Sequence, residues 1–193
     1  STAVRGASLR GRTIGGNRPS GPPGRNALKV SFRVNGQPYE FNVGNGLGMV
    51  EPSHTLAHTL RETLGLTGTK IACNHGACAA CTVLVDGKPV LSCLTLTVEC
   101  EEKEITTIEG LEDQRTGKLD PLQEAFVSET AFQCGFCTPG MLMASKALLT
   151  EKPSPTEEEI KGALSGHFCR CISHYHVLRA VIAAAAAGGK RHV

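Results

Sequence analysis

The sequence predicts an α+β protein in which a small β-sheet domain precedes a helical domain. Between residues 28 and 109, apolar and polar side chains alternate over short stretches separated by turn-forming pairs, as is typical of strands. Between residues 110 and 189, apolar side chains recur at helical spacing instead. The cysteines divide at the same point, with one group in each half. We therefore expect two domains, 28–109 and 110–189, preceded by a flexible N-terminal extension, 1–27.

The N-terminal extension lacks an apolar core. Residues 1–27 combine five arginines with glycine, serine and proline, and such a composition cannot bury enough apolar surface to fold alone. We expect a flexible tail. Two other readings stay open. The segment could wrap around a partner subunit, or it could remain from a trimmed targeting segment, since the numbering starts at Ser rather than Met.

The sheet domain opens with a predicted β-hairpin. Its first strand has four apolar residues that alternate with polar ones and are expected on one face: Leu28, Val30, Phe32 and Val34. Asn35-Gly36 is a strong hairpin signal. The second strand repeats the alternation at Tyr39, Phe41 and Val43.

A helix and a second hairpin follow in the same domain. Leucines at helical spacing predict a helix from Thr55 to Leu64, with Ser53 or Thr55 as the N-cap. Asp86-Gly87 then marks the turn of the second hairpin. The remaining predicted strands are Thr82–Val85, Pro89–Leu91 and Ile105–Ile108. Together these elements indicate a small mixed sheet with one helix packed across it.

Four helices are predicted in the second half. They are Leu122–Val127, Pro139–Leu149, Thr156–Leu164 and His174–Ala187. Pro139 suits a first helical turn, and Thr156 with Glu159 has the form of a capping box. Gly188-Gly189 ends the last helix. The pattern is typical of a small helical bundle.

Composition argues against two classes of partner. The net charge is +2, aromatic residues are 4% and Trp is absent, whereas nucleic-acid binding needs basic patches and stacking aromatics. No apolar run reaches the roughly 18–20 residues that a membrane span needs. Nine cysteines without a visible signal peptide favour metal binding over disulfides. We therefore expect a soluble, cytoplasmic protein that binds neither nucleic acid nor membrane.

The first cysteine motif has the plant-type [2Fe–2S] spacing, C-x4-C-x2-C followed by a distant fourth cysteine. Its members are Cys73, Cys78, Cys81 and Cys93. A cluster needs backbone amides close to its sulfurs, and small residues inside the loop allow this: Gly76, Ala77, Ala79 and Ala80. A zinc site or a disulfide pair is the alternative. Zinc ribbons, however, usually use two C-x2-C knuckles.

The second cysteine motif consists of two short pairs, Cys134-x2-Cys137 and Cys169-x-Cys171, each next to a predicted helix. Two such pairs could hold zinc, but zinc knuckles generally have two to four intervening residues, which the C-x-C pair does not. Beside the first motif, a second iron–sulfur cluster is favoured.

Both motifs together resemble the iron–sulfur subunit of the molybdenum hydroxylases, the family of xanthine dehydrogenase, aldehyde oxidoreductase, carbon monoxide dehydrogenase and 4-hydroxybenzoyl-CoA reductase. The matching stretches are GTKIACNHGACAACTVLVDG, QCGFCTPGM and CRC. The resemblance covers roughly residues 28–187. It implies an N-terminal plant-ferredoxin-like β-grasp domain and a C-terminal four-helix [2Fe–2S] domain with approximate two-fold symmetry. It also implies that the chain binds no substrate itself.

The resemblance further implies roles for nine residues. The ligands of the solvent-side cluster are Cys73, Cys78, Cys81 and Cys93, and those of the cluster nearer the molybdenum are Cys134, Cys137, Cys169 and Cys171. Gln133 matches the glutamine that hydrogen-bonds the molybdopterin of the large subunit, and its amide can both donate and accept. An ordinary polar residue at a helix end is the alternative for Gln133.

The function implied is electron transfer within a larger enzyme. Two [2Fe–2S] clusters would relay single electrons between the molybdopterin centre of a large partner subunit and a flavin or external acceptor, with an FAD-binding medium subunit as a further partner. No catalytic residue is visible in the chain itself. A free-standing ferredoxin-like carrier or a redox sensor is the alternative. A simple ferredoxin would need only the first domain.

Some residues depart from the family pattern or match no ligand. Ala79 replaces a usual Gly, and Ile172-Ser173-His174 replaces T-G-Y after the last cysteine. Cys100 matches no ligand and is expected to be a half-buried structural thiol. The histidines are not expected to bind metal. His54 and His58 suit a solvated helix face. His75 is not needed as a ligand, because four cysteines already complete the first motif. The histidines that flank the inner motif are candidates for tuning its potential or contacting a partner, namely His167, His174 and His176.

Overall fold

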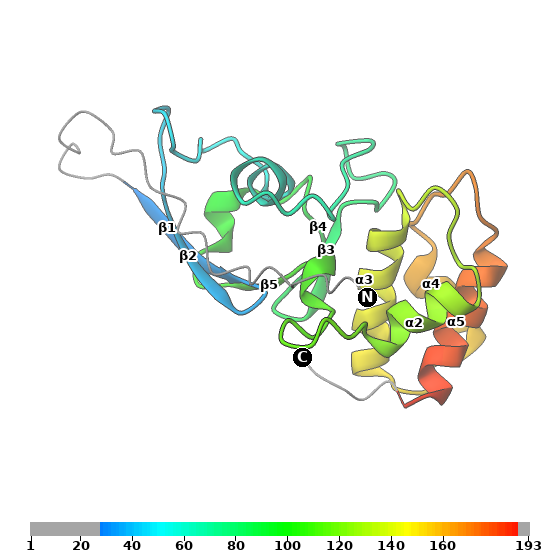
Figure 1. Ribbon diagram of the computed structural model, residues 1–193. Coiled ribbons are helices and arrows are strands. Elements are labelled where there is room, and N and C mark those ends of the chain that lie inside the picture. Colours follow the sequence, from blue (N-terminus) through cyan, green and yellow to red (C-terminus); the bar gives the residue numbers. More distant parts are fainter. Residues whose placement is uncertain (1–27, 189–193) are drawn as a thin grey trace, which may run out of the picture.

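The computed structural model of the chain describes residues 28–188, so the prediction of a flexible N-terminal extension lies outside the described residues. A β-sheet unit and a helical unit lie side by side (Figure 1). The strands are β1 (Lys29–Val34), β2 (Gln37–Asn42), β3 (Thr82–Val85), β4 (Lys88–Leu91) and β5 (Glu104–Thr106). The helices of the second unit are α2 (Pro121–Ser128), α3 (Thr138–Glu151), α4 (Glu157–Leu164) and α5 (His174–Ala186).

The five strands form one mixed sheet in the order β2-β1-β5-β3-β4. β1 pairs antiparallel with β2 and β3 with β4, while β5 lies between the two hairpins, parallel to β1 and antiparallel to β3. Asn35 and Gly36 have φ of 51° and 77°, and this left-handed backbone at both positions suits a tight hairpin turn. The predicted mixed sheet and its first turn are confirmed.

One face of β1 supplies the core of the sheet unit. Val30, Phe32 and Val34 are buried together with Leu56 and Leu60. Burying such side chains is the main favourable term in folding. The prediction that Leu28 shares this face is wrong: Leu28 is 64% exposed because it precedes β1 and lies beyond the core.

The helix predicted from Thr55 to Leu64 is present but changes its winding. Thr55 caps α1 (Leu56–His58), accepting a hydrogen bond from the His58 amide at 3.3 Å. The chain then widens into a π-helical turn, η1 (Thr59–Thr63), closed by the Leu64 amide on the Thr59 carbonyl. Leu56 and Leu60 remain on its buried side.

Two short 3₁₀ turns, η2 (Thr97–Cys100) and η3 (Ile108–Gly110), flank β5. The strand predicted at residues 105–108 is therefore shifted, since β5 covers Glu104–Thr106 and Ile108 begins a turn. Cys100 is more deeply buried than predicted, with 1% of its surface exposed.

The helical unit forms around its own core. The N-caps are Asp120, Thr156 and Ser173, and the predicted capping box of Thr156 and Glu159 is confirmed. α2 packs on α5 and α3 on α4. The largest fully buried side chains of this core are Leu122, Phe126, Met141 and Ile160. Among the described helices, none is long and apolar enough to cross a bilayer.

The two units meet where α3 lies against β3 and β4. Gly140, in the first turn of α3, makes the closest approach: a Cβ at this position would come within 2.3 Å of the Ala79 carbonyl oxygen. A side chain has no room there, so glycine allows α3 to approach the backbone of Ala79 and Ala80.

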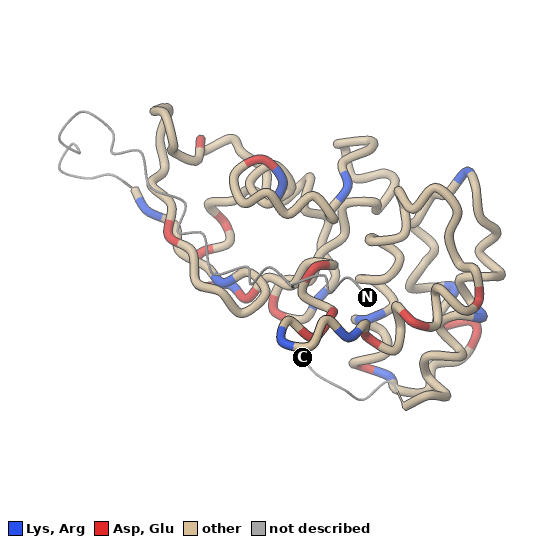
Figure 2. The backbone as a smooth tube through the Cα atoms, viewed as in Figure 1, with Lys and Arg blue, Asp and Glu red and all other residues tan. Residues whose placement is uncertain are grey.

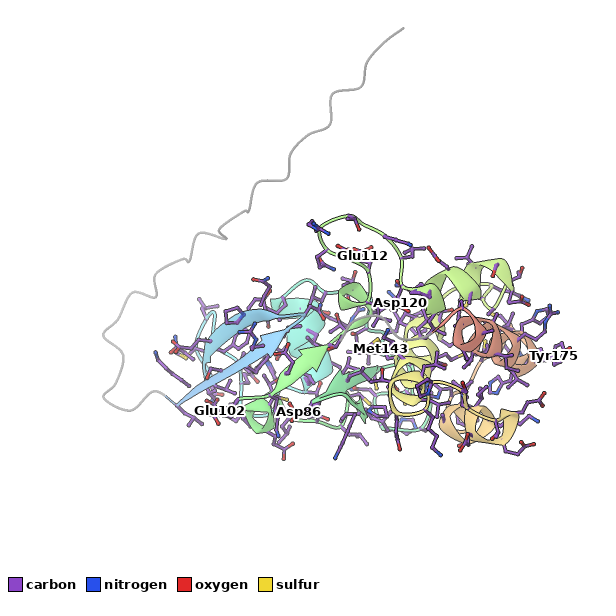
Figure 3. All side chains as sticks on the ribbon, turned by 90° about the horizontal axis from the view of Figure 1, so that it is seen from below. Asp86, Glu102, Glu112, Asp120, Met143 and Tyr175 are labelled. Carbon is purple, nitrogen blue, oxygen red and sulfur yellow. The ribbon has the colours of Figure 1, made fainter. Side chains whose placement is uncertain are left out.

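A buried ion pair ties α2 to α3. Lys146 Nζ lies 2.6 Å from Asp120 Oδ2, and both side chains are only 6% exposed. Asp120 also accepts a hydrogen bond from the Leu122 amide at 2.9 Å. Figure 3 shows Asp120 and Met143 in the middle of the molecule, where the helices meet the sheet.

Candidate metal centres

The first candidate centre is the loop before β3, called the outer loop here (residues 72–81), together with Cys93 after β4. Left-handed backbone at Asn74, Gly76 and Ala79 winds the loop tightly. The Ala77 amide points at Cys73 Sγ, 3.3 Å away. A loop wound in this way can aim several amides at one sulfur site, as an anionic centre requires.

The thiols of the outer site lie in two contacting pairs, Cys73 with Cys78 and Cys81 with Cys93. A hydrogen bond from the backbone of His75 lowers the pKa of Cys73 to about 6. Burial raises the pKa of Cys81 to about 11. Cys73 and Cys78 are partly exposed, whereas Cys81 and Cys93 are buried, so the second pair is shielded from water.

The second candidate centre is formed by two loops that precede helices. Cys134 and Cys137 lead into α3, and Cys169 and Cys171 lead into α5. Cys171 Sγ lies 3.6 Å from Cys134 Sγ, and the Cys137 thiol contacts that of Cys169. Two cysteine pairs that are well separated in the sequence thus meet in space, and they are here called the inner site.

The inner thiols differ in their surroundings. Burial raises the pKa of Cys137 to about 12. Burial alone would also raise the pKa of Cys169, but hydrogen bonds from the Ile172 amide, 3.3 Å away, and from the Cys137 thiol lower it. The contact with Cys134 raises the pKa of Cys171. Both Cys134 and Cys171 are exposed.

The donor set fits two [2Fe–2S] clusters. Such a cluster has two irons, held in all by four thiolates, so each iron takes two cysteines. Eight thiols in four contacting pairs match that requirement. Among residues 28–188, no three His, Cys, Asp or Glu side chains converge on a point for a single ion. The backbone amides of Ala77 and Ile172 donate hydrogen bonds to the sulfurs of Cys73 and Cys169, and such bonds tune iron–sulfur sites.

The remaining predicted residues take distinct places. Gln133 is exposed beside Cys134, and its amide has no hydrogen-bond partner within residues 28–188. His75 Nδ1 bonds the Cys73 carbonyl at 2.6 Å. The rings of His54 and His58 lie 4.2 Å apart, near Glu51 rather than near any cysteine. Burial lowers the pKa of His167.

A direct link between the two sites was not visible in the sequence. The Phe168 amide donates to the Cys78 carbonyl at 3.3 Å, so the segment just before Cys169 touches the outer loop. Gly140 backs onto Ala79 at the same place. In the sequence, the only sign that two backbones approach so closely is a glycine two positions after the start of a helix.

Fold and sites together define a two-domain protein with a [2Fe–2S]-binding domain in each half. Residues 34–128 match the model of a 2Fe-2S iron-sulfur cluster binding domain, and residues 107–182 match that of a [2Fe-2S] binding domain. The predicted fold class, a ferredoxin-like β-sheet domain followed by a four-helix domain, is confirmed.

Similar proteins narrow the class further. The chain is 50% identical to the nicotine 6-hydroxylase small subunit of Paenarthrobacter nicotinovorans, over 69% of this chain and 79% of the relative. It is 42% identical to a probable xanthine dehydrogenase subunit from Bacillus subtilis, over 78% and 83%. In quinoline 2-oxidoreductase from Pseudomonas putida 86, a chain 43% identical superposes with a TM-score of 0.75, over 83% of this chain and 95% of that one.

The chain belongs to the family of small [2Fe–2S] subunits of the molybdenum hydroxylases. It is therefore an electron-relaying iron–sulfur subunit of a multi-subunit oxidoreductase, as the sequence predicts.

Proposed function

We propose that this chain relays single electrons between a molybdopterin centre on a large partner subunit and a flavin, on a medium subunit, or an external acceptor. The observation that carries the proposal is the gathering of eight thiols into two sites, one per unit, that touch each other through the Phe168 amide and the Cys78 carbonyl. When bound, a [2Fe–2S] cluster supplies one-electron redox chemistry.

The ligand assignment follows the thiol pairs. The outer site takes Cys73, Cys78, Cys81 and Cys93, and the inner site takes Cys134, Cys137, Cys169 and Cys171. Two separate hydrophobic cores, one below residue 106 and one above residue 121, support a domain boundary at residues 109–110. Thiols that hold iron must stay reduced, which supports a reducing compartment such as the cytoplasm.

The surface around the inner site suits a permanent partner. Phe132 and Phe136 are exposed beside Cys134, and Phe168 is 69% exposed before Cys169. Residues 130–145 contain no Lys, Arg, Asp or Glu, so that this stretch is tan in Figure 2, and the one charged residue of the second cysteine pair is the exposed Arg170. Aromatic residues and arginine are enriched at protein interfaces, whereas Lys, Asp and Glu are depleted there. We infer that the large subunit covers this surface and keeps water from Cys134 and Cys171.

Gln133 is the residue assigned to the partner's cofactor. Its side chain is exposed at the start of the inner loop, between Phe132 and Cys134. A primary amide offers two donors and an acceptor, which matches the hydrogen-bonding edge of a pterin. The chain would thus orient the molybdopterin against its own inner site.

Native purification with mass and metal analysis tests the proposal. We expect the chain to co-purify with a much larger, molybdenum-containing subunit, and to carry about four irons and four acid-labile sulfides. A stable monomer of 20.3 kDa with full iron and no molybdenum-containing partner would instead favour a free carrier. Zinc in place of iron would reject the ligand assignment.

A further inference from the structure

His167 lies where the two sites meet. Its side chain is 7% exposed, and its Nε2 lies 3.1 Å from the Gly140 carbonyl oxygen. His167 precedes the ligand Cys169 by two residues, and Gly140 follows the ligand Cys137 by three. The imidazole therefore connects the two loops of the inner site.

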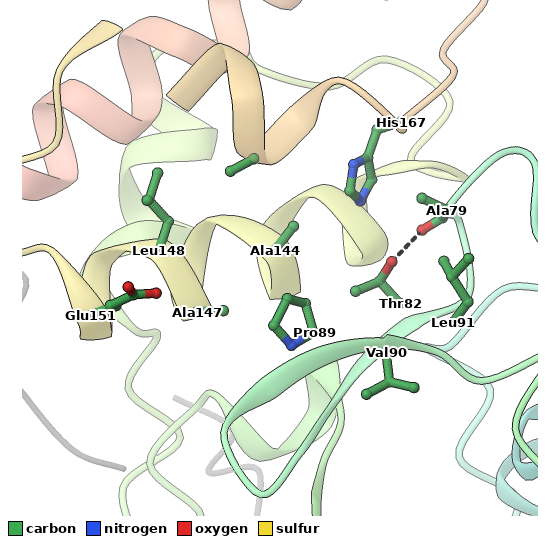
Figure 4. Close-up of a pocket in the computed structure, with 11 residues that line it drawn as sticks. Ala79, Thr82, Pro89, Val90, Leu91, Ala144, Ala147, Leu148, Glu151 and His167 are labelled. Atoms are coloured by element: carbon green, nitrogen blue, oxygen red, sulfur yellow. Dashed lines mark hydrogen bonds between the residues drawn. The ribbon is translucent and has the colours of Figure 1, made fainter. Parts of the chain in front are cut away.

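The same contact reaches the outer site. Gly140 lies against the backbone of Ala79 and Ala80, directly after the ligand Cys78. The neighbour of His167, Phe168, donates its amide to the Cys78 carbonyl at 3.3 Å. Figure 4 shows the ring of His167 above the first turn of α3, with Ala79 and Thr82 across from it. Segments carrying ligands of both sites thus converge on one side chain.

The hydrogen bond from His167 is not needed to complete the helix. In an α-helix, the carbonyl of Gly140 has the amide four residues further on as its donor. A carbonyl has a second lone pair, and the imidazole uses it. Since a carbonyl can only accept, Nε2 carries the hydrogen. The bond is therefore a cross-link between α3 and the segment before Cys169.

Packing around His167 is incomplete on one side. A groove of about 260 Å³ lies beside His167, lined mostly by small or apolar side chains such as Ala79, Ala144 and Leu91. The segment therefore has space on one side to shift. His167 Nδ1 is buried and has no hydrogen-bond partner within residues 28–188. An apolar side chain would avoid that unfavourable burial, so the bond to Gly140 is what histidine contributes here.

We propose that His167 is a positioning residue that fixes the separation of the two clusters by holding the Gly140 carbonyl. The proposal rests on the proposed function, because it requires a cluster at each site. The rate of electron transfer falls steeply with the distance between centres, so a fixed separation sets the rate at which electrons pass between the two clusters.

The test compares three variants of the complete complex with the wild type. His167→Leu removes the donor at similar size, and His167→Gln restores a donor at the reach of Nε2. His176→Leu is the matched control, since His176 Nδ1 also bonds a carbonyl, that of Glu129, at 3.2 Å. Iron content, the magnetic splitting between the two reduced clusters in the EPR spectrum, and amide exchange of the peptide around Phe168 are measured.

We expect all variants to keep both clusters. In His167→Leu, the splitting should shrink or vanish and the Phe168 amide should lose its protection from exchange. His167→Gln should restore both, and His176→Leu should resemble the wild type. A His167→Leu complex with full iron, wild-type splitting and a protected Phe168 amide would overturn the proposal.

Two further outcomes are also decisive. If His167→Leu fails to load iron, the comparison passes to His167→Gln: failure of this variant too would show that the ring shape, not the hydrogen bond, matters, and would overturn the proposal. A wild-type complex with fewer than two clusters would instead contradict the proposed function itself.

Discussion

Ala79 holds the most constrained backbone in the outer loop. Its φ is +54°, a left-handed conformation that costs an L-residue roughly 1–2 kcal/mol. Its carbonyl accepts from the Thr82 hydroxyl at 2.8 Å and lies against Gly140, so the conformation cannot relax without moving α3. The replacement of the family's usual glycine by Ala79 is thus a source of local strain.

Ala79→Gly should therefore be neutral or stabilising by up to about 1 kcal/mol, because relief of the left-handed strain offsets the greater freedom of glycine in the unfolded chain. The midpoint of thermal loss of the iron–sulfur absorption measures it. Ala80→Gly is the matched control: Ala80 is equally buried but has no positive φ, and its replacement should cost about 0.5–1 kcal/mol. Equal losses in both variants would show that Ala79 is not strained.

Cys100 lies outside both groups of proposed ligands. It is buried, its Sγ lies 3.6 Å from the Leu96 carbonyl oxygen, and burial raises its pKa to about 11. Its thiol contacts a backbone carbonyl, whereas each of the eight proposed ligands contacts another cysteine thiol.

We expect Cys100→Ala to leave the iron content unchanged. Cys93→Ala makes the same change in side-chain volume at another buried cysteine, and it should remove the EPR signal of the outer site alone. Metal analysis and the EPR spectrum of the reduced complex provide the comparison. Iron loss from Cys100→Ala would mean that a ligand was misassigned.

At the scale of elements, the pair of Lys146 and Asp120 joins the first two helices of the helical unit. Lys146→Met would leave the Asp120 carboxylate buried without its partner, at a cost of about 3–5 kcal/mol. Amide exchange in α2, measured in the intact complex, should become correspondingly faster.

The second replacement separates charge from packing. Adding Asp120→Asn to Lys146→Met removes the unpaired charge while keeping an N-cap oxygen, and most of the protection in α2 should return. As a control, Lys152→Met breaks the exposed pair of Lys152 and Glu159, which water screens, and it should leave the protection of α2 unchanged. If the double variant is no better than the single one, packing of the lysine stem rather than charge holds α2.

The elements that sequence predicts well are those with local causes. The Asn35-Gly36 turn, the Thr55 cap and the capping box of Thr156 are set by residues within a few positions, and the structure has all three. The exposure of Leu28 and the π-helical winding at Thr59–Thr63 depend instead on contacts with distant parts of the fold. The same holds for the sites: spacing identifies the cysteines, but their pairing and the contact of Gly140 with Ala79 join residues far apart in sequence.

At the scale of the whole molecule, the exposed aromatic surface at the inner site should be the main contact with the large subunit. Phe136 is 46% exposed there. Phe136→Asp places a charge where a partner excludes water, and it should weaken association by about 2 kcal/mol or more. Ile182→Asp, at 41% exposure on α5, is the control and should leave the complex intact.

Size-exclusion chromatography of the co-expressed subunits, with iron measured in each fraction, distinguishes the outcomes. We expect Phe136→Asp to shift the chain to a separate fraction, and Ile182→Asp to elute with the large subunit. If only Ile182→Asp dissociated the complex, the interface would lie on α5 rather than at the inner site.

The position of β5 has a consequence for how the chain is made. β5 is the middle strand of the sheet, yet it is the last of the five to leave the ribosome. Until residue 106 has emerged, the nascent chain can form two separate hairpins, each of which is marginally stable in water. The cysteines from Cys73 to Cys93 have all been synthesised by then. A chaperone or an iron donor that meets the chain at this stage encounters open strand edges and an unfinished sheet, and only the arrival of β5 joins the halves.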